Sequence, residues 1–142
     1  QAMDISGFNQ LAAVGNDFDI YSNGALQSIS GFPQLAIVGN ELRISHNSLY
    51  HVTGIGLQDI SGFDQLATVG TALRIYYNYD LRTISGFGKL VNAPRYLDIS
   101  DNVRLETISG FNELASVPHD LLISHNSRLQ HISGFDVLAT VG

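Results

Sequence analysis

The chain contains no cysteine. Zinc–thiolate sites, disulfide frameworks and cysteine nucleophiles are therefore excluded, because each of them needs that residue. Basic residues are also few: 7 Lys and Arg stand against 13 Asp and Glu, for a formal net charge of −6. Such a chain has no basic stripe with which to neutralise phosphates, so we expect no nucleic-acid partner.

Long apolar runs are missing as well. None approaches the roughly 20 residues that a membrane-spanning helix needs, so we expect no membrane insertion by this segment. No signal peptide is visible, and Gln1-Ala2-Met3 is typical of an expression remnant. Only 14% of residues are charged, and no Asn-x-Ser/Thr sequon occurs. A polar, weakly charged surface without cysteine or sequons favours an extracellular or cell-surface protein of prokaryotic origin.

What the chain does contain is a repeat. The tetrapeptide Ile-Ser-Gly-Phe occurs six times, and its copies are spaced by 24, 31, 24, 24 and 24 residues. A fixed period of this size indicates a solenoid, in which stacked repeats bury together the apolar face that one repeat cannot bury alone. Residues 4–142 are therefore expected to form a single solenoid domain of about five and a half repeats, part of a longer protein.

Within each repeat, a Leu-x-Ile segment has the alternation of a strand, with the middle residue facing outward. A Phe-x-x-Leu-x-x-Val segment has spacings of three, which favour a 3₁₀ or short helical turn. The Ser of each Ile-Ser-Gly lies where a helix N-cap would lie. The expected fold is of the α/β class, mostly β: a right-handed solenoid of short parallel strands joined by such turns.

Two further columns follow from the period. Each Phe of the tetrapeptide is expected to stack on the Phe of the next repeat, forming an aromatic spine in the core. An asparagine also recurs three residues after the strand Ile, where its amide can bond backbone groups of its own and adjacent repeats. These asparagines are Asn23, Asn47, Asn78, Asn102 and Asn126.

The pattern L-x-I-x-x-N-x-x-L-x-x-I followed by F-x-x-L-x-x-V resembles the leucine-rich-repeat superfamily. Its I-x-G-F variant is most similar to the receptor L domain, the repeat module of insulin-receptor and EGF-receptor ectodomains that also occurs in microbial surface proteins. The resemblance covers essentially the whole chain, although the cysteine-capped ends of the receptors are missing. It implies an L-domain-like architecture and, by analogy, a recognition role.

The positions where the sequence departs from the regular repeat are the candidates for ligand binding. The 31-residue spacing contains seven extra residues near 49–55, and insertions of this kind commonly lie on a binding face. Beside it, the outward strand positions vary in sequence and are rich in Tyr and Arg, which are enriched at binding hot spots. An inert bulge and a solvated sheet face are the alternatives. The candidate ligand-binding residues are Tyr76, Tyr77, Tyr79, Arg43, Arg74, His46, Tyr50 and Tyr21.

Catalysis and metal binding find no support in the sequence. His46 and His125 occupy equivalent positions three repeats apart, about 14 Å at the spacing of neighbouring strands, so they cannot share one metal. Asp101 and His125 fall on neighbouring repeats and could pair near Ser124, but nothing resembles a nucleophile elbow. We expect no catalytic residues, no metal and no cofactor: the protein is predicted not to be an enzyme.

The favoured function is a recognition module that binds a protein or carbohydrate ligand. A passive spacer in a larger adhesin is the alternative, and an ice-binding lattice is a third class, because the tetrapeptide Ser residues form a regular column. Neither end shows a distinct cap, and uncapped solenoid ends expose strand edges. End-to-end self-association is therefore a further expectation.

Overall fold

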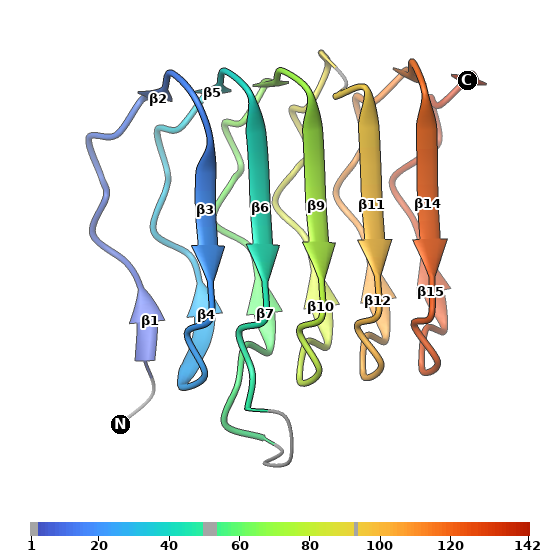
Figure 1. Cartoon of the computed structure of the whole chain (residues 1–142). Coiled ribbons are helices and arrows are strands. Elements are labelled where there is room, and N and C mark those ends of the chain that lie inside the picture. Colours follow the sequence, from blue (N-terminus) through green and yellow to red (C-terminus); the bar gives the residue numbers. More distant parts are fainter. Residues whose placement is uncertain (1–2, 50–53, 93) are drawn as a thin grey trace.

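The computed structural model describes residues 3–49, 54–92 and 94–142. The described chain forms a parallel β-solenoid of about six turns with a 24-residue period. In Figure 1 the nearer strands run downward, the chain returns upward behind them, and it advances from left to right, which is a right-handed coil. The repeat prediction is thus confirmed, with one tetrapeptide in each turn.

Parallel strands make up the three sides of the coil among the described residues (Figure 1). The front sheet contains, in spatial order, β3 (Phe18–Tyr21), β6 (Glu41–Ser45), β9 (Ala72–Tyr76), β11 (Tyr96–Ser100) and β14 (Asp120–Ser124). The second sheet contains β1 (Met3–Ile5), β4 (Leu26–Ile29), β7 (Asp59–Ile60), β10 (Thr83–Ile84), β12 (Thr107–Ile108) and β15 (His131–Ile132). The third side is made of β2 (Ala13–Val14), β5 (Ile37–Val38) and β8 (Thr68–Val69), followed by the pair β13 (Ser116–Val117) and β16 (Thr140–Val141).

The connecting segments differ from the prediction. No helix occurs among the described residues, so the structure is mostly β, without the expected helical component. Each Phe-x-x-Leu segment is a single turn, as where the Leu66 amide donates to the Phe63 carbonyl at 3.0 Å. Three strands share one 24-residue turn, which leaves too few residues to repay the cost of helix nucleation. The tetrapeptide Ser residues have no helix to cap; the Ser85 and Ser109 hydroxyls instead donate to strand carbonyls one turn earlier, at 3.4 Å.

The predicted aromatic spine is present. Consecutive tetrapeptide Phe rings stack nearly parallel, with centroids 5.3 Å apart between Phe63 and both of its neighbours, Phe32 and Phe87. The stack continues to Phe8 at one end and to Phe135 at the other. Phe63 is 0% exposed. The aromatic column is therefore a structural core that runs the length of the coil.

The predicted asparagine column is confirmed too, and it is a continuous hydrogen-bonded ladder. Asn78 Nδ2 donates to the Ile44 carbonyl of the preceding turn at 3.0 Å, and Asn78 Oδ1 accepts from the Asn47 amide at 3.0 Å. Asn102 repeats the pattern with Ile75 and Asn78. The central members are fully buried, so their polar atoms are satisfied by the protein itself.

The extra residues of the 31-residue repeat lie partly outside the described residues, Tyr50 among them. Among the described residues that follow the insertion, the Leu57 amide donates to the Asn47 carbonyl at 2.7 Å. The regular coil resumes at Leu57. Buried Asp80 holds this junction, since its carboxylate accepts from the Gly54 amide at 2.8 Å and the Gly56 amide at 3.2 Å. Arg104 pairs with the same carboxylate at 3.1 Å. Asp80 is an anchoring residue that the repeat pattern did not reveal.

The ends of the coil expose core positions. Phe8 in the first turn is 52% exposed, and Ile132 in the last turn is 52% exposed, whereas the equivalent Ile84 is fully buried. β3 and β14 are the outer strands of the front sheet, and each has one unpaired edge.

Because exposed edges and apolar ends favour pairing between chains, we expect the 142-residue chain to associate end to end as its concentration rises. Light scattering across a dilution series measures this directly. A constant monomer mass over the whole series would contradict it.

Candidate functional site

The front sheet separates core from surface by simple alternation. On β9, Leu73 and Ile75 face inward and are fully buried, while Arg74 and Tyr76 face outward. The strands pair without a shift from β3 to β14, so equivalent outward residues form columns across the sheet. The middle column is Asp19, Arg43, Arg74, Asp98 and Leu122, and the column beside it is Tyr21, Ser45, Tyr76, Ser100 and Ser124.

Charges on the first strands of the sheet are paired among themselves. Arg43 Nη2 lies 2.6 Å from Asp19 Oδ2, and this hydrogen bond raises the pKa of Arg43 above its ordinary value. The same guanidinium lies over the Tyr21 ring, 5.5 Å from its centroid. Arg74 Nη1 lies 3.4 Å from Glu41 Oε1. Asp98, next in the middle column, has a different environment: its Oδ1 is shielded from solvent and has no hydrogen-bond partner among the described residues.

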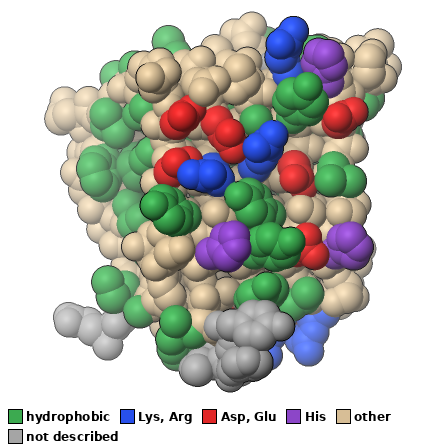
Figure 2. Space-filling view, in the orientation of Figure 1, with side chains coloured by type: hydrophobic (Ala, Val, Ile, Leu, Met, Phe, Trp, Pro, Cys, Tyr) green, Lys and Arg blue, Asp and Glu red, His purple; other side chains and the backbone are tan. Residues whose placement is uncertain are grey.

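An aromatic cluster lies at the carboxyl ends of β6 and β9, consisting of His46, Tyr76, Tyr77 and Tyr79. The His46 ring packs against Tyr76 at 5.7 Å and Tyr77 at 5.0 Å between centroids, and Tyr77 reaches Tyr79 at 6.3 Å. Figure 2 shows most of the acidic and basic side chains of this face in its upper half, and below them a band of hydrophobic and histidine side chains that also contains an acidic one. The aromatic cluster thus adjoins charged side chains on the same sheet.

The residue that follows each front strand has a left-handed backbone. These five residues are Ser22, His46, Tyr77, Asp101 and His125, with φ between 53° and 58°. None is glycine, and this conformation costs a residue with a side chain roughly 1–2 kcal/mol. It turns the chain so that the following Asn enters the ladder. The side chain of the left-handed residue itself stays at the surface of the corner. Sequence reasoning gave no sign of this for Tyr77, since Asn, Asp and His are the residues usually enriched there.

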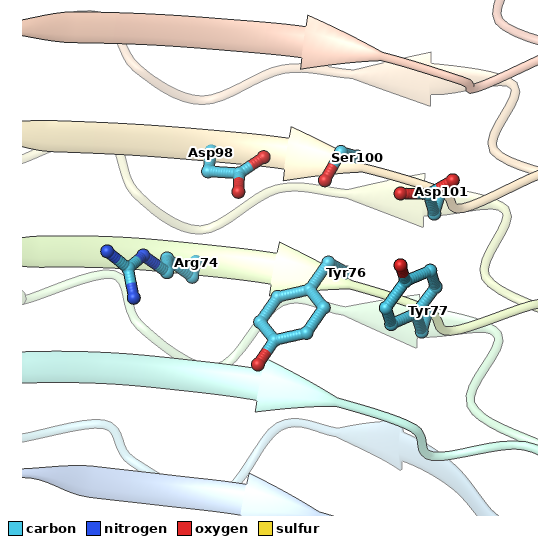
Figure 3. Close-up of a pocket in the computed structure, with 6 residues that line it drawn as sticks. All are labelled: Arg74, Tyr76, Tyr77, Asp98, Ser100 and Asp101. Carbon is cyan, nitrogen blue, oxygen red and sulfur yellow. The ribbon is translucent and has the colours of Figure 1, made fainter.

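Two adjoining hollows lie on the sheet beside the aromatic cluster. The first, about 300 Å³, is lined by Arg74, Tyr76, Tyr77, Asp98, Ser100 and Asp101 (Figure 3). Tyr76 leans from β9 towards β6, which leaves the space over Ser100 open. The second, about 270 Å³, is lined by Arg74, Tyr96, Leu97, Asp98, Asp120 and Leu122. Arg74 and Asp98 line both, so the hollows meet at the middle column.

The predicted site residues divide into groups. Tyr76, Tyr77, Tyr79 and His46 come together in the aromatic cluster, and Arg74 adjoins it through the first hollow. Arg43 and Tyr21 contact each other nearer the first turn and line neither hollow. Tyr50 lies outside the described residues. The prediction omitted seven residues that line the hollows: Asp98, Ser100, Asp101, Tyr96, Leu97, Asp120 and Leu122. Apart from the buried Leu97, their place on the outer face was readable from the repeat, but the hollows depend on side-chain size and direction.

The predicted contact between Asp101 and His125 is present, with His125 Nδ1 3.6 Å from Asp101 Oδ1. Ser124 Oγ lies 3.5 Å from the same Nδ1 atom. A catalytic triad instead needs the acid on one ring nitrogen and the nucleophile on the other, so this arrangement is not a triad. Across the described ranges, no group of three or more His, Asp or Glu side chains is placed to hold a metal ion. The part of the chain that the structure describes also has no helix capable of crossing a membrane.

Comparison with known proteins adds no relative: no family model, curated protein or solved structure matches this chain. The front sheet itself is therefore the basis for a functional conclusion. It offers an exposed aromatic cluster and two polar hollows on a regular ladder, which are features suited to binding.

Proposed function

We propose that this protein is a non-enzymatic recognition module, exposed at or outside a prokaryotic cell surface, that binds a protein or carbohydrate ligand through its front sheet. The observation that carries the proposal is the aromatic cluster. Tyr77 keeps an exposed ring at a left-handed backbone position, in contact with His46 and Tyr76. The left-handed corner recurs after every front strand, so what sets this corner apart is the cluster of aromatic rings that it presents at the surface.

Rigidity supports the same proposal. The cluster stands on strands whose inward residues are fully buried and whose ends are fixed by the asparagine ladder. A surface that is already ordered loses little conformational entropy on binding, so more of the contact energy becomes affinity. Tyr is also among the residue types enriched at binding hot spots.

The architecture fits a relationship to the leucine-rich-repeat superfamily, in its receptor L-domain variant. The support is the I-x-G-F corner, the Leu-x-Ile strand and the inward Asn, which recur once per turn of the parallel coil. We infer recognition rather than lattice binding, because the hydroxyls of Ser85 and Ser109 donate to backbone carbonyls of the neighbouring turn. A passive spacer is an outcome that the following experiment would reveal.

Tyr77→Gly is the sharpest test, because it removes the ring and relieves the left-handed backbone together. We expect the free energy of unfolding to stay equal or rise by up to about 1 kcal/mol, while binding to hits from a glycan array or a displayed random-peptide library is lost. Thermal unfolding and surface plasmon resonance measure the two effects.

Ser22→Gly is the matched control. Ser22 has the same backbone conformation, with φ 58°, but it follows β3 and lies outside the aromatic cluster. It should retain binding and gain at least as much stability as Tyr77→Gly, because it relieves the same backbone conformation without removing ring contacts. Equal binding by wild type and Tyr77→Gly would refute a role for the cluster, and the absence of any ligand in both screens would favour the spacer.

A further inference from the structure

We propose that the two hollows together form a binding site for a neutral oligosaccharide. This inference rests on the proposed recognition function of the front sheet and names its ligand class. The hollows adjoin through Arg74 and Asp98, and they run diagonally from Tyr76 and Tyr77 at the end of β9 to Tyr96 at the start of β11 and Leu122 on β14. A single extended ligand can therefore contact both.

The mixture of positive and negative side chains in the two hollows indicates which functional groups a ligand would need. Each hollow contains the Arg74 guanidinium, which only donates hydrogen bonds, and carboxylates, which only accept them. An added cation would face Arg74, and an added anion would face Asp98 together with Asp101 or Asp120. A hydroxyl group both donates and accepts, so it satisfies both kinds of partner without a net charge. Sugars present such groups in dense, fixed arrays.

Asp98 supplies an acceptor that the protein leaves unused. Its Oδ1 is shielded from bulk water and has no hydrogen-bond partner in the part of the chain that the structure describes, although Asp98 lines both hollows. Leaving a buried polar atom unpaired is costly, and buried acceptors normally find a donor. Rotation of the Asp98 side chain would turn this oxygen towards a ligand hydroxyl placed between the hollows, and that hydroxyl would provide the donor. Arg74, already 3.4 Å from Glu41, is held near the same point and can donate to a second ligand oxygen.

Aromatic rings stand at both ends of this path. Tyr76 and Tyr77 border the first hollow, and Tyr96 borders the second, where it stacks on His119 at 5.3 Å. The C–H face of a pyranose ring packs well against such aromatic surfaces. Tyr96 pairs with Ala72, four residues before Tyr76 on the neighbouring strand. Their backbone positions are thus about 14 Å apart by ordinary strand dimensions. That span exceeds one sugar ring, so the ligand is an oligosaccharide rather than a monosaccharide.

The excess of acidic over basic side chains in the hollows narrows the class of oligosaccharide further. Asp98, Asp101 and Asp120 line the hollows against the one guanidinium of Arg74, which is itself paired with Glu41. Sulfated or uronate-rich glycans would meet this acidic excess and be disfavoured. Neutral oligosaccharides should therefore bind in preference to anionic ones of the same length.

The test uses an array of immobilised neutral, sulfated and uronate-containing oligosaccharides, followed by calorimetric titration of the neutral compounds that bind. Asp98→Ala should weaken their binding by about tenfold or more, as expected for a lost hydrogen bond to a charged acceptor. Tyr76→Ala should weaken it similarly. Asp64→Ala, which removes an exposed carboxylate on a turn away from the front sheet, is the charge-matched control and should bind as wild type does. Thermal unfolding of Asp98→Ala should show stability equal to wild type or higher, since the substitution removes a shielded oxygen that lacks a donor.

Preferential binding of anionic glycans, or full binding by Asp98→Ala, would overturn the inference. So would the absence of any glycan ligand. If displayed basic peptides bind instead and Tyr77→Gly abolishes their binding, the recognition function stands and the carbohydrate assignment fails. If neither glycans nor peptides bind, both fail together.

Discussion

Phe63→Ala should lower the free energy of unfolding by about 3–5 kcal/mol, the range for removing a fully buried aromatic side chain. Phe63 is completely buried, and its ring stacks on Phe32 and Phe87 with centroids 5.3 Å away on each side. Its loss opens a cavity that neighbouring turns cannot close, because the hydrogen-bonded sheets fix their spacing. Denaturant unfolding followed by far-UV circular dichroism measures the change, as the chain has no tryptophan to report by fluorescence.

Phe8→Ala is the matched control for this effect. Phe8 occupies the same place in the first turn, but it stacks on only one tetrapeptide ring, Phe32, at 5.1 Å, and it is half-exposed. Phe8→Ala should therefore lower the free energy of unfolding by much less than Phe63→Ala does. Equal losses at both positions would show that stacking along the spine does not govern stability.

Asn78→Ala is expected to have an effect of similar size, about 3–5 kcal/mol, through a different cause. Asn78 is fully buried; its Nδ2 donates to the carbonyls of Ile44 and Tyr76, and its Oδ1 accepts from the Asn47 amide. Alanine would leave the buried Asn47 amide without its acceptor, which costs about 1–3 kcal/mol, and would also remove the side-chain donor from two carbonyls, those of Ile44 and Tyr76. The Tyr76 carbonyl keeps its bond from the His46 amide. Thermal and denaturant unfolding give the measurement.

Two variants separate hydrogen bonding from shape. Asn78→Asp keeps the shape and the acceptor but loses the donors to Ile44 and Tyr76 and buries a charge, so it should not restore stability. Asn23→Ala, in the first turn, should cost less, because Asn23 is exposed and water can replace its bonds. Wild-type stability of Asn78→Asp would argue that the ladder acts through packing alone.

Much of the scaffold was predictable because the repeat imposes one arrangement on every turn. The Phe spine and the Asn ladder both follow from a residue type that recurs at a fixed place, which leaves a single way to stack. The helical turns were predicted wrongly for a related reason. Apolar spacing of three between Phe63, Leu66 and Val69 fits a helix, but it fits equally a single turn that leads into the two-residue strand β8. The spacing alone does not distinguish a turn that continues from one that stops.

The candidate site was predictable only in part. Alternation identified the outward face and brought Tyr76 and Tyr77 to one place on it. The depth of the hollows depends on where large and small side chains adjoin, as Tyr76 does beside Ser100, and on the direction in which each leans. Asp80 was missed for a different reason: it anchors a segment present in one turn alone, so no repeating pattern marks it.

The front sheet keeps its register across the longest repeat. β6 and β9 pair Leu42 with Leu73 and Ile44 with Ile75, which are 31 residues apart, just as β9 and β11 pair residues that are 24 apart. Chain added at the corner after Asn47 therefore changes neither strand pairing nor the core, and the entropic cost of a longer loop rises only slowly with its length. The coil thus offers a natural insertion point for foreign peptides, and any such graft would be displayed beside the tyrosines of the front sheet.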